Sequence, residues 1–364
     1  MRKKIEEIFF LGQDSTSRKD FEARDTGIIH VLKLFSPGTA MRTSLDDMLR
    51  AKMGALIVID KEGIFNIVDG GFRVNCKFST QRLVELAKMD GAIILSKDMK
   101  KILYSNALLV PSMNIKTRET GTRHKAAERT AKQINSIVIA VSERKNKVTI
   151  YCGEEKHILE KSSEILRRAT ETLQILEKQK ESYDDELSHL NVLEVTNLTT
   201  TNDVCNILQR IEVIRRASEM VRRYLIELGK EGIIVSMRLK ELTKNLSKER
   251  EMLLKDYFRD NHIHADDILS NMDLDSLLET ATISKILFEE LSDKPISPIG
   301  LRILNKTNLQ SEIINLIKDN FGLEKIFATP EEGLINIFKD KEKVKFISQE
   351  LSSLREKILA GKKI

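Results

Sequence analysis

Five consecutive residues about a third of the way along the chain have the side chains best suited to chemistry. Gly121 and Thr122 precede a run of good helix formers, so we expect the free backbone N–H groups of a helix start there. Such groups bind phosphate, because the helix dipole points the same way. Arg123 adds a planar fork for phosphate oxygens, and His124 and Lys125 add donors and charge. The cluster indicates an anion-binding site but does not specify a reaction. The alternative is a solvated helix start capped by Thr122.

A second candidate is a carboxylate at a turn. Asp90 and Gly91 follow a predicted helix and directly precede a predicted strand, Ala92–Leu95. The carboxylate can point into a cleft there, and Gly91 removes a side chain where a ligand needs room. Because Asp-Gly is also a common turn dipeptide, the pair taken alone favours an ordinary turn.

Strands and helices that would position these residues alternate before residue 155. Short runs of Val, Ile and Leu predict strands, and amphipathic runs between them predict helices. Ser79 is the expected N-cap of the helix that begins at Thr80. This alternation indicates an α/β domain with a mixed central sheet. The predicted strands are Ala55–Asp60, Ala92–Leu95, Lys101–Tyr104, Ala107–Val110, Ile137–Val141 and Val148–Tyr151, and the predicted helices are Thr43–Lys52, Thr80–Met89 and about Lys125–Gln133.

The pattern changes near residue 155. Apolar residues then recur at near-heptad spacing, which predicts an all-α bundle with long helices at Val204–Leu228 and Gly232–Phe258. Two prolines in Asp293–Pro298 break any helix and mark a boundary. We therefore expect an N-terminal extension (1–30), an α/β domain (31–155), a helical linker domain (156–295) and a small helical C-terminal domain (296–364).

Composition excludes several function classes. The chain of 364 residues has a formal net charge of +5, which is weak evidence for a polyanionic partner. Its three cysteines form no CxxC pair, so they fit a reducing cytoplasm and offer neither a zinc site nor a disulfide framework. No apolar run reaches about 18 residues, so no membrane span is expected. His262 and His264 would diverge on a helix, so a loop rather than a metal site is predicted there.

Taken together, the two clusters resemble the diadenylate cyclase family in residue type, order and spacing. The matching motifs span about 33–152, and the order of the predicted domains extends the likeness, more loosely, to the whole chain of the DNA integrity scanning members of that family. The motifs are Ser36–Thr39, Leu45–Asp47, Met53–Leu56, Gly70–Phe72, Phe78–Ser79, Leu86–Ala92, Leu109–Pro111, Glu119–His124 and Ala140–Ser142.

This resemblance implies an enzyme that condenses two ATP molecules into cyclic di-AMP and two pyrophosphates, with Mg²⁺ or Mn²⁺ as cofactor. It implies that Asp90 binds the metal and helps to activate a 3′-hydroxyl, that Gly91 lets the nucleotide approach, that Leu109 contacts adenine and that Ser142 lies near the nucleotide. The implied catalytic residues are Asp90, Arg123 and His124, and the implied ATP-binding residues are Asp90, Gly91, Leu109, Gly121, Thr122, Arg123, His124, Lys125 and Ser142.

Self-association follows from the stoichiometry of this reaction. A product with two equivalent halves requires two sites that face each other, so we expect a homo-oligomer. The resemblance implies an octamer, and the sparse cysteines lead us to expect a location in the cytoplasm. The family's motif reads Arg-His-Arg where this chain has Lys125 in the third place. Because lysine keeps the charge but loses the bidentate fork, we expect lower activity rather than none.

The C-terminus departs further from the family. The resemblance implies a helix-hairpin-helix-like domain that senses branched DNA through a Gly-x-Gly turn, but the corresponding stretch, Ile337–Lys345, has no glycine. Its lysines would bind DNA phosphates as point charges, or form an ordinary solvated face. These lysines are Lys339, Lys341, Lys343 and Lys345.

Two other functions stay open. One is a non-catalytic DNA-binding scaffold that retains a nucleotide pocket, and the other is a nucleotidyltransferase that acts on a different acceptor. The intact set Asp90, Gly91, Arg123 and His124 favours the cyclase over the scaffold.

Overall fold

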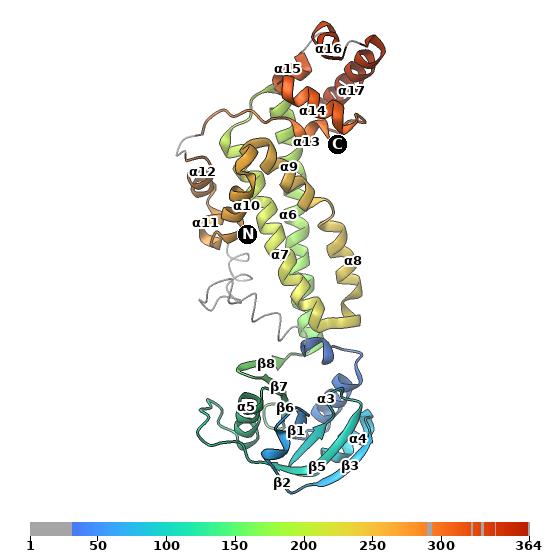
Figure 1. The fold of residues 1–364 in the computed structure, drawn as a ribbon, viewed down its shortest axis with the longest axis vertical. Helices are drawn as coiled ribbons and strands as arrows, with labels where there is room; N and C mark the ends of the chain where they lie inside the picture. Colours follow the sequence, from blue (N-terminus) through green and yellow to red (C-terminus); the bar gives the residue numbers. More distant parts are fainter. Residues whose placement is uncertain (1–30, 290–292, 322, 329–330, 339, 363–364) are drawn as a thin grey trace. The chain divides into compact units, whose positions relative to one another are not determined.

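The computed structural model describes residues 31–289, 293–321, 323–328, 331–338 and 340–362 (Figure 1). The predicted N-terminal extension lies outside the described residues. The chain divides into two compact units: an α/β unit that runs to Thr170 and includes Arg222–Ser236, and a helical unit that contains Glu171–Val221 and Met237–Ile364. The four-part division expected from the sequence remains a prediction.

A mixed eight-stranded sheet organises the α/β unit. Its strands are β1 (Ala55–Ile59), β2 (Val68–Asp69), β3 (Phe72–Lys77), β4 (Ala92–Leu95), β5 (Lys101–Leu109), β6 (Ile137–Ser142), β7 (Lys147–Cys152) and β8 (Glu155–Leu159). They lie in the order β2-β5-β4-β1-β6-β7-β8, and β3 also pairs with β5. β1 and β4 run parallel, whereas the other pairs are antiparallel. The predicted α/β fold with a mixed sheet is confirmed.

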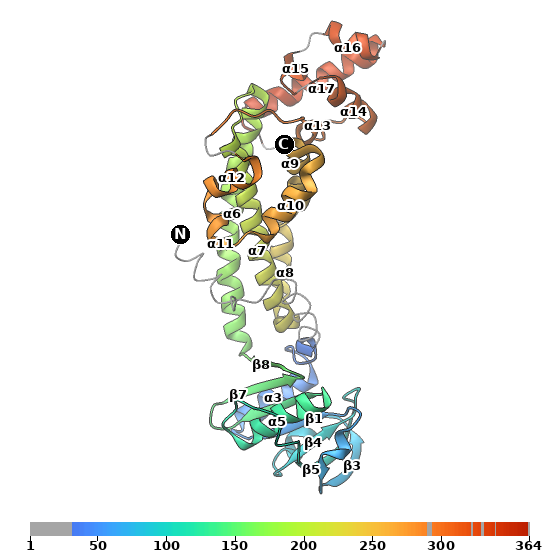
Figure 2. The same cartoon turned by 60° about the vertical axis from the view of Figure 1, so that its left-hand side comes forward.

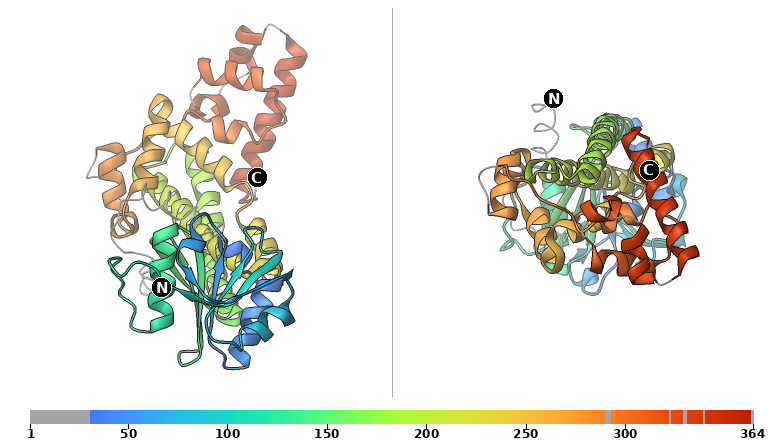
Figure 3. Two further views of the ribbon diagram at one scale, coloured as in Figure 1. Left: turned by 60° about the horizontal axis from the view of Figure 1, so that its bottom comes forward. Right: turned by 90° about the horizontal axis from the view of Figure 1, so that it is seen from above.

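Helices cover both faces of this sheet. The helices α3 (Ala40–Arg50) and α4 (Thr80–Leu86) lie on one face, and α5 (Thr122–Ile134) lies on the other (Figure 3). Because successive strand residues point to opposite faces, neighbours in β1 belong to different cores. Ile57 packs in the core with α3 and α4, and Val58 in the core with α5. The Oγ of Ser79 accepts a hydrogen bond from the backbone N–H of Arg82 at 3.3 Å, so the predicted cap of α4 is confirmed.

Where strand predictions differ from the structure, the strands are irregular or lie at an edge. The predicted strands Lys101–Tyr104 and Ala107–Val110 fall in one strand, β5, which ends at Leu109 and bulges where Asn106 adopts a φ of +54°. Strands β3 and β8 each pair with one neighbour. β3 is mostly exposed and β8 alternates half-buried and exposed residues, so neither has the apolar run that marks a strand in the sequence. β8 also extends beyond the predicted domain boundary at 155.

The linker region is helical, as predicted. Its helices are α6 (Ser162–Thr196), α7 (Thr201–Leu228), α8 (Ile233–Leu242), α9 (Leu246–Phe258), α10 (His262–Asn271), α11 (Leu274–Leu278) and α12 (Thr280–Phe288). The long helices α6 and α7 run side by side (Figure 2), and Arg210 hydrogen-bonds Gln179 across them at 2.7 Å. The predicted helix Gly232–Phe258 is divided, because Asn245 adopts a left-handed φ of +61°. No helix among the described residues is long and apolar enough to span a bilayer.

The predicted loop at His262 and His264 is wrong. Both residues belong to the first turn of α10, and Nδ1 of His262 lies 2.6 Å from the carbonyl oxygen of Arg259. The two-residue spacing that argues against a shared metal does not argue against a helix, since a helix simply separates the two rings.

A buried carboxylate holds three linker helices together. Glu212 of α7 is fully buried and pairs with Arg215 and Arg216 at 2.7 Å, and with Arg250 of α9. Burial acts to raise the pKa of Glu212, but the hydrogen bonds and charges of the arginines outweigh it and lower the pKa to about 2. Arg250 in turn contacts Asp266 of α10 at 2.6 Å.

Glu212→Ala is expected to lower the free energy of unfolding by about 3–5 kcal/mol at pH 7, because it strands buried arginines. The folded pKa lies below the ordinary value of 4.5, so Glu212 stabilises the fold above that value and loses this contribution as the pH falls towards 2. Urea unfolding at pH 7 and pH 3 measures the shrinking difference. The exposed pair of Glu164 and Arg167 supplies the control, Glu164→Ala, which should cost little.

The chain ends in a small group of helices, as expected for its last part. They are α13 (Leu301–Leu304), α14 (Ser311–Asn320), α15 (Leu323–Ala328), α16 (Glu331–Phe338) and α17 (Lys341–Leu359). The buried Arg302 of α13 pairs with the buried Glu194 of α6 at 2.6 Å. Asp256 of α9 accepts backbone hydrogen bonds from Leu301 at 2.7 Å and Arg302 at 2.9 Å. The start of this group is therefore fixed to the linker helices.

Candidate active site

The ends of four strands meet at one edge of the sheet. Leu56 at the start of β1 pairs with Ala92 at the start of β4, and Ala92 pairs with Ala107 near the end of β5. On the other side, Ala55 pairs with Val141 at the end of β6. Residues that directly precede β1 and β4, or that end β5 and β6, therefore share this edge. Asp90, Gly91, Leu109 and Ser142 all meet this condition, although they are spread over 53 positions of sequence.

Arg123 reaches the same edge from α5. A Cβ atom added to Gly54, the residue before β1, would lie 2.1 Å from Nη1 of Arg123. The guanidinium therefore occupies the space that the missing side chain leaves. Gly54 has no left-handed φ, so what its missing side chain permits here is the close approach of the guanidinium and not an unusual backbone conformation. The structure thus brings the Arg123 side chain to the sheet edge from which Asp90 extends.

The start of α5 is open. Gly121 is the N-cap, with a φ of −81°, and no side chain caps the helix there. Thr122 is the first helical residue and not the cap that the alternative interpretation expected. Gly121 and Thr122 are exposed, and Arg123, His124 and Lys125 are half-buried. Uncapped N–H groups beside a guanidinium suit an anionic ligand.

Gly91 is required by the sheet itself. Its φ is +96°, and a Cβ atom there would lie 2.9 Å from the carbonyl carbon of Asn106 and 3.0 Å from the oxygen of Ala107. The expectation that Gly91 leaves room for a ligand thus omits its main role, which is to let β4 approach β5 at the bulge. Asp90 next to it is exposed.

The place of Leu109 and Ser142 in the candidate site rests on their positions in the strands. Leu109 is buried in the core beneath α5, whereas its neighbour Leu108 is 60% exposed. The Oγ of Ser142 accepts a hydrogen bond from the backbone N–H of Lys145 at 3.3 Å, so it shapes the turn that follows β6. Both residues lie at the same edge as Asp90 by strand register.

The segment before α5 is fastened to that helix. Nε of Arg129 donates to the carbonyl oxygen of Ile115 at 3.0 Å, and the backbone N–H of Ser112 donates to Oε1 of Gln133 at 2.8 Å. Thr117 hydrogen-bonds Glu128, whose pKa is lowered: burial opposes the change, but the bonds from Thr117 and Lys132 outweigh it. The turn that carries Gly121 is therefore preformed.

Sequence reasoning did not assign roles to the residues that surround His124. The rings of His124 and Tyr151 lie edge to face, with centroids 6.4 Å apart at 79°. The Tyr151 hydroxyl donates to Oε1 of Glu119 at 2.9 Å, and Lys156 forms an ion pair with the same carboxylate. The signal was present in the strand alternation, because Tyr151 pairs with Val138 and shares its face, the one that α5 covers.

The described residues of the lysine-rich C-terminal stretch lie at the end of α16 and the start of α17. Lys341, Lys343 and Lys345 are exposed in the first turns of α17, and Lys339 lies outside the described residues. The carboxylate of Asp340 caps α17 and accepts from the backbone N–H groups of Glu342 at 3.0 Å and Lys343 at 3.4 Å. Because Asp340 already fills the anion position of this helix start, only the lysine side chains are left to meet a phosphate.

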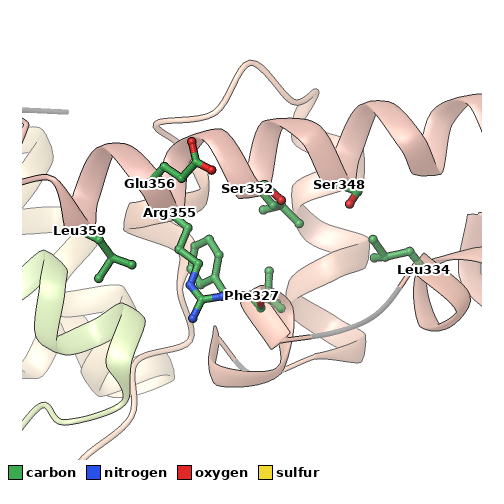
Figure 4. Close-up of a pocket in the computed structure, with 9 residues that line it drawn as sticks. Phe327, Leu334, Ser348, Ser352, Arg355, Glu356 and Leu359 are labelled. Atoms are coloured by element: carbon green, nitrogen blue, oxygen red, sulfur yellow. Dashed lines mark hydrogen bonds between the residues drawn. The ribbon is translucent and has the colours of Figure 1, made fainter.

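A cavity of about 310 Å³ lies in the same helical group (Figure 4). Arg355 crosses it, with Nη1 3.5 Å from the carbonyl oxygen of Phe327. None of the residues that the sequence singled out lines it. The lining residues are Ile326, Phe327, Leu334, Ser348, Leu351, Ser352, Arg355, Glu356 and Leu359.

Among solved structures, one match is a double mutant of DacA from Staphylococcus aureus, which is 22% identical and covers 37% of this chain and 88% of its own. Its TM-score of 0.28 supports no conclusion about the fold.

Family models match two regions of the chain, and curated relatives align with most of its length. Residues 42–156 match the DisA bacterial checkpoint controller nucleotide-binding model, and residues 159–292 match the DisA bacterial checkpoint controller linker region. DNA integrity scanning protein DisA from Acetivibrio thermocellus is 42% identical over 324 residues, which are 86% of this chain and 90% of the relative. The protein of that name from Clostridium botulinum (strain Eklund 17B) is 41% identical over 95% of this chain and 99% of its own. The chain belongs to the DisA family of DNA integrity scanning proteins.

Proposed function

We propose that this protein is a diadenylate cyclase that condenses two ATP molecules into cyclic di-AMP and two pyrophosphates. The observation that carries the proposal is the convergence at one sheet edge of the Asp90 carboxylate, the Arg123 guanidinium beside Gly54 and the uncapped start of α5. Phosphoryl transfer needs in-line positioning and charge stabilisation more than covalent catalysis, and these groups supply both. Membership of a family with a nucleotide-binding domain supports it.

In the proposed reaction each chain holds one ATP. The 3′-oxygen of one ATP forms a bond to the α-phosphorus of the other, the bond from that phosphorus to the bridging oxygen breaks, and pyrophosphate leaves. The hydroxyl proton passes to solvent, and the reciprocal attack closes the ring. Arg123 and the backbone N–H groups at the start of α5 would hold the triphosphate and stabilise the charge that develops on its oxygens.

The residues at this edge fit a hard divalent cation such as Mg²⁺ or Mn²⁺. Asp90 is an exposed carboxylate, and Mg²⁺ is commonly held by one or two carboxylates together with substrate phosphates. Within the described part of the chain no cluster of three or more His, Cys, Asp or Glu residues is suited to a metal, so the substrate would supply further oxygen ligands. When bound, the cation lowers the pKa of the attacking hydroxyl and neutralises charge on the phosphates.

The same stoichiometry leads us to propose a homo-oligomer in which two such edges face each other. The resemblance to the diadenylate cyclase family leads us to propose an octamer as the assembled form. A single site that holds one ATP supplies only one half of the product, and the second, equivalent half must come from a second site that faces the first. Light scattering of the full chain, with and without a non-hydrolysable ATP analogue, measures the assembly. A protein that stays monomeric under both conditions yet makes cyclic di-AMP would contradict the face-to-face arrangement.

Incubation of the purified protein with ATP and Mn²⁺, with the nucleotide products separated by chromatography, tests the proposed activity. Cyclic di-AMP and pyrophosphate in a ratio of one to two support the cyclase. Transfer of AMP to another acceptor would instead support the alternative nucleotidyltransferase. If the ATP stays unchanged, the non-catalytic scaffold is the interpretation that remains.

Lys125→Arg tests the departure from the family's motif. Lys125 lies half-buried in the first turn of α5, close in sequence to Arg123, which we propose binds the triphosphate. Because arginine offers a bidentate fork where lysine offers a point charge, we expect kcat/KM for ATP to stay unchanged or to rise. Initial rates over a range of ATP concentrations measure it, and a large loss would show that this site specifically requires lysine.

DNA binding by the C-terminal helices is proposed as a second function, carried by the exposed lysines of α17. Gel-shift with a four-way junction at several salt concentrations tests it. Binding through Lys341, Lys343 and Lys345 should weaken as salt rises, with a smaller salt slope in the variant in which all three are replaced by Gln. Absent or salt-independent binding contradicts it.

A further inference from the structure

One buried tyrosine contacts the proposed phosphate-binding turn on both sides. Glu119 lies two residues before the N-cap of α5, and His124 lies in the first turn of the helix. Tyr151 of β7 donates its hydroxyl to Glu119 at 2.9 Å and presents its ring to that of His124. Since Tyr151 is only 1% exposed, its position is set by the core and not by the turn.

The carboxylate of Glu119 is held by a second contact. Lys156 of β8 pairs with the same oxygen that accepts the Tyr151 hydrogen bond. The Glu119 side chain is 14% exposed and that of Lys156 is 45% exposed, so the ion pair closes the outer side of this contact. The segment before α5 is thereby joined to two strands that supply none of the sequence-predicted nucleotide residues.

The charge states of these groups are consistent with one direction of the hydrogen bond. Burial acts to raise the pKa of Glu119, but the bonds from Lys156 and Tyr151 outweigh it and lower the pKa. Burial and the Glu119 bond raise the pKa of Tyr151 well above its ordinary value. At neutral pH the tyrosine therefore keeps its proton and donates a hydrogen bond to an ionised carboxylate.

His124 lies among groups of both signs. Burial is the main cause that lowers its pKa, and Lys145, Lys156 and Arg123 lower it further, whereas the Glu119 carboxylate raises it. Glu119 is the one acidic group among these causes, so its removal leaves only influences that disfavour the imidazolium.

We propose that Glu119 and Tyr151 are a positioning pair that fixes His124 and the turn at Gly121 and Thr122 toward the phosphates of ATP. Neither residue is proposed to touch the substrate; they act through the turn and the imidazole. The inference rests on the proposed cyclase function for its kinetic consequence only, because the contacts themselves belong to the fold.

Tyr151→Phe, Glu119→Gln and the double variant test the pair in the full-length protein. Tyr151→Phe keeps the buried ring and removes the hydrogen bond. We expect each single variant to lower kcat about tenfold with little change in KM for ATP, because Arg123 still binds the triphosphate while its alignment is lost. Glu119→Gln breaks the ion pair with Lys156 and leaves only a weaker, uncharged acceptor for the Tyr151 hydroxyl. Because Tyr151 acts on the turn through Glu119, the loss in the double variant should be smaller than the product of the two single losses.

Tyr104→Phe is the matched control. Tyr104 belongs to β5, and the centroid of its ring lies 5.4 Å from that of Phe65. Like Tyr151→Phe, the Tyr104→Phe variant removes one phenol oxygen from the α/β unit. It should keep the wild-type kcat. Unchanged kcat in both single variants, or additive losses in the double variant, would overturn the pair.

An NMR titration of His124 separates this proposal from the proposed activity. The His124 signal is assigned as the one lost in His124→Gln. In Glu119→Gln the pKa of His124 should fall relative to wild type, and in Tyr104→Phe it should not move. An unchanged His124 titration in Glu119→Gln overturns the positioning pair even if the protein makes cyclic di-AMP. A lowered pKa supports the pair even if no product forms from ATP, a result that overturns only the cyclase.

Discussion

Asp90→Asn is expected to lower cyclic di-AMP formation by about 10³-fold or more while leaving the fold unchanged. Asp90 is exposed and precedes β4, and the unusual backbone conformation of its turn belongs to Gly91. Replacing the carboxylate by the amide of asparagine should therefore not disturb the fold. Its proposed duty is to hold the divalent cation, and a neutral amide binds such a cation far more weakly than a carboxylate. Product formation with Mg²⁺ and Mn²⁺, measured beside the thermal unfolding midpoint, tests both halves of this expectation.

Two further variants make that result decisive. Asp90→Ala removes the carboxylate without creating an Asn-Gly pair, whose amide hydrolyses slowly back to Asp. Asp60→Asn changes a carboxylate that follows β1, at the opposite edge of the same sheet, and should keep full activity. Turnover retained by both Asp90 variants would remove this residue from the mechanism.

The sequence was informative wherever a residue's surroundings follow from local rules. Strand β4 was predicted with its observed bounds, because four fully buried apolar residues stand between an Asp-Gly turn and a polar loop. The cap at Ser79 was predicted for the same kind of reason. The edge strands β3 and β8 were missed because an edge strand is paired on one side only and its exposed residues carry no apolar signal. The sequence predicts two strands separated at Ser105 and Asn106, whereas the structure has one strand, β5, with a bulge where Asn106 adopts a left-handed φ.

The site followed the same division. Asp90 and Arg123 were singled out by residue type, but the register that puts them at one edge depends on pairing between β1, β4 and β6, which no local pattern specifies. In the sequence Gly54 is only one residue of a motif, whereas the structure gives it a role, because the Arg123 guanidinium occupies the space beside it. Strand alternation places Tyr151 on the face that α5 covers, but no local pattern specifies the two partners that it reaches across 27 and 32 positions of sequence.

Gly54→Ala is expected to lower kcat/KM for ATP by about 10²-fold with little loss of stability. The added methyl group would lie 2.1 Å from Nη1 and 2.9 Å from Cζ of Arg123, so the guanidinium must leave its place. The side chain can move at small cost because its far end is flexible, and alanine suits the backbone here since Gly54 has no left-handed φ. A displacement of about 1 Å in a group that aligns a reacting phosphate is enough for such a loss.

A double-mutant cycle shows whether the methyl group acts through Arg123. In an Arg123→Ala background the space beside position 54 is empty, so Gly54→Ala should have no further effect on kcat/KM. Arg123→Ala alone should lose at least as much as Gly54→Ala alone, because it removes the guanidinium that the other variant only displaces. Equal fold losses from Gly54→Ala in both backgrounds would mean that the methyl group acts on something other than Arg123. The convergence of that guanidinium with Asp90 at the sheet edge would then no longer support the proposed cyclase.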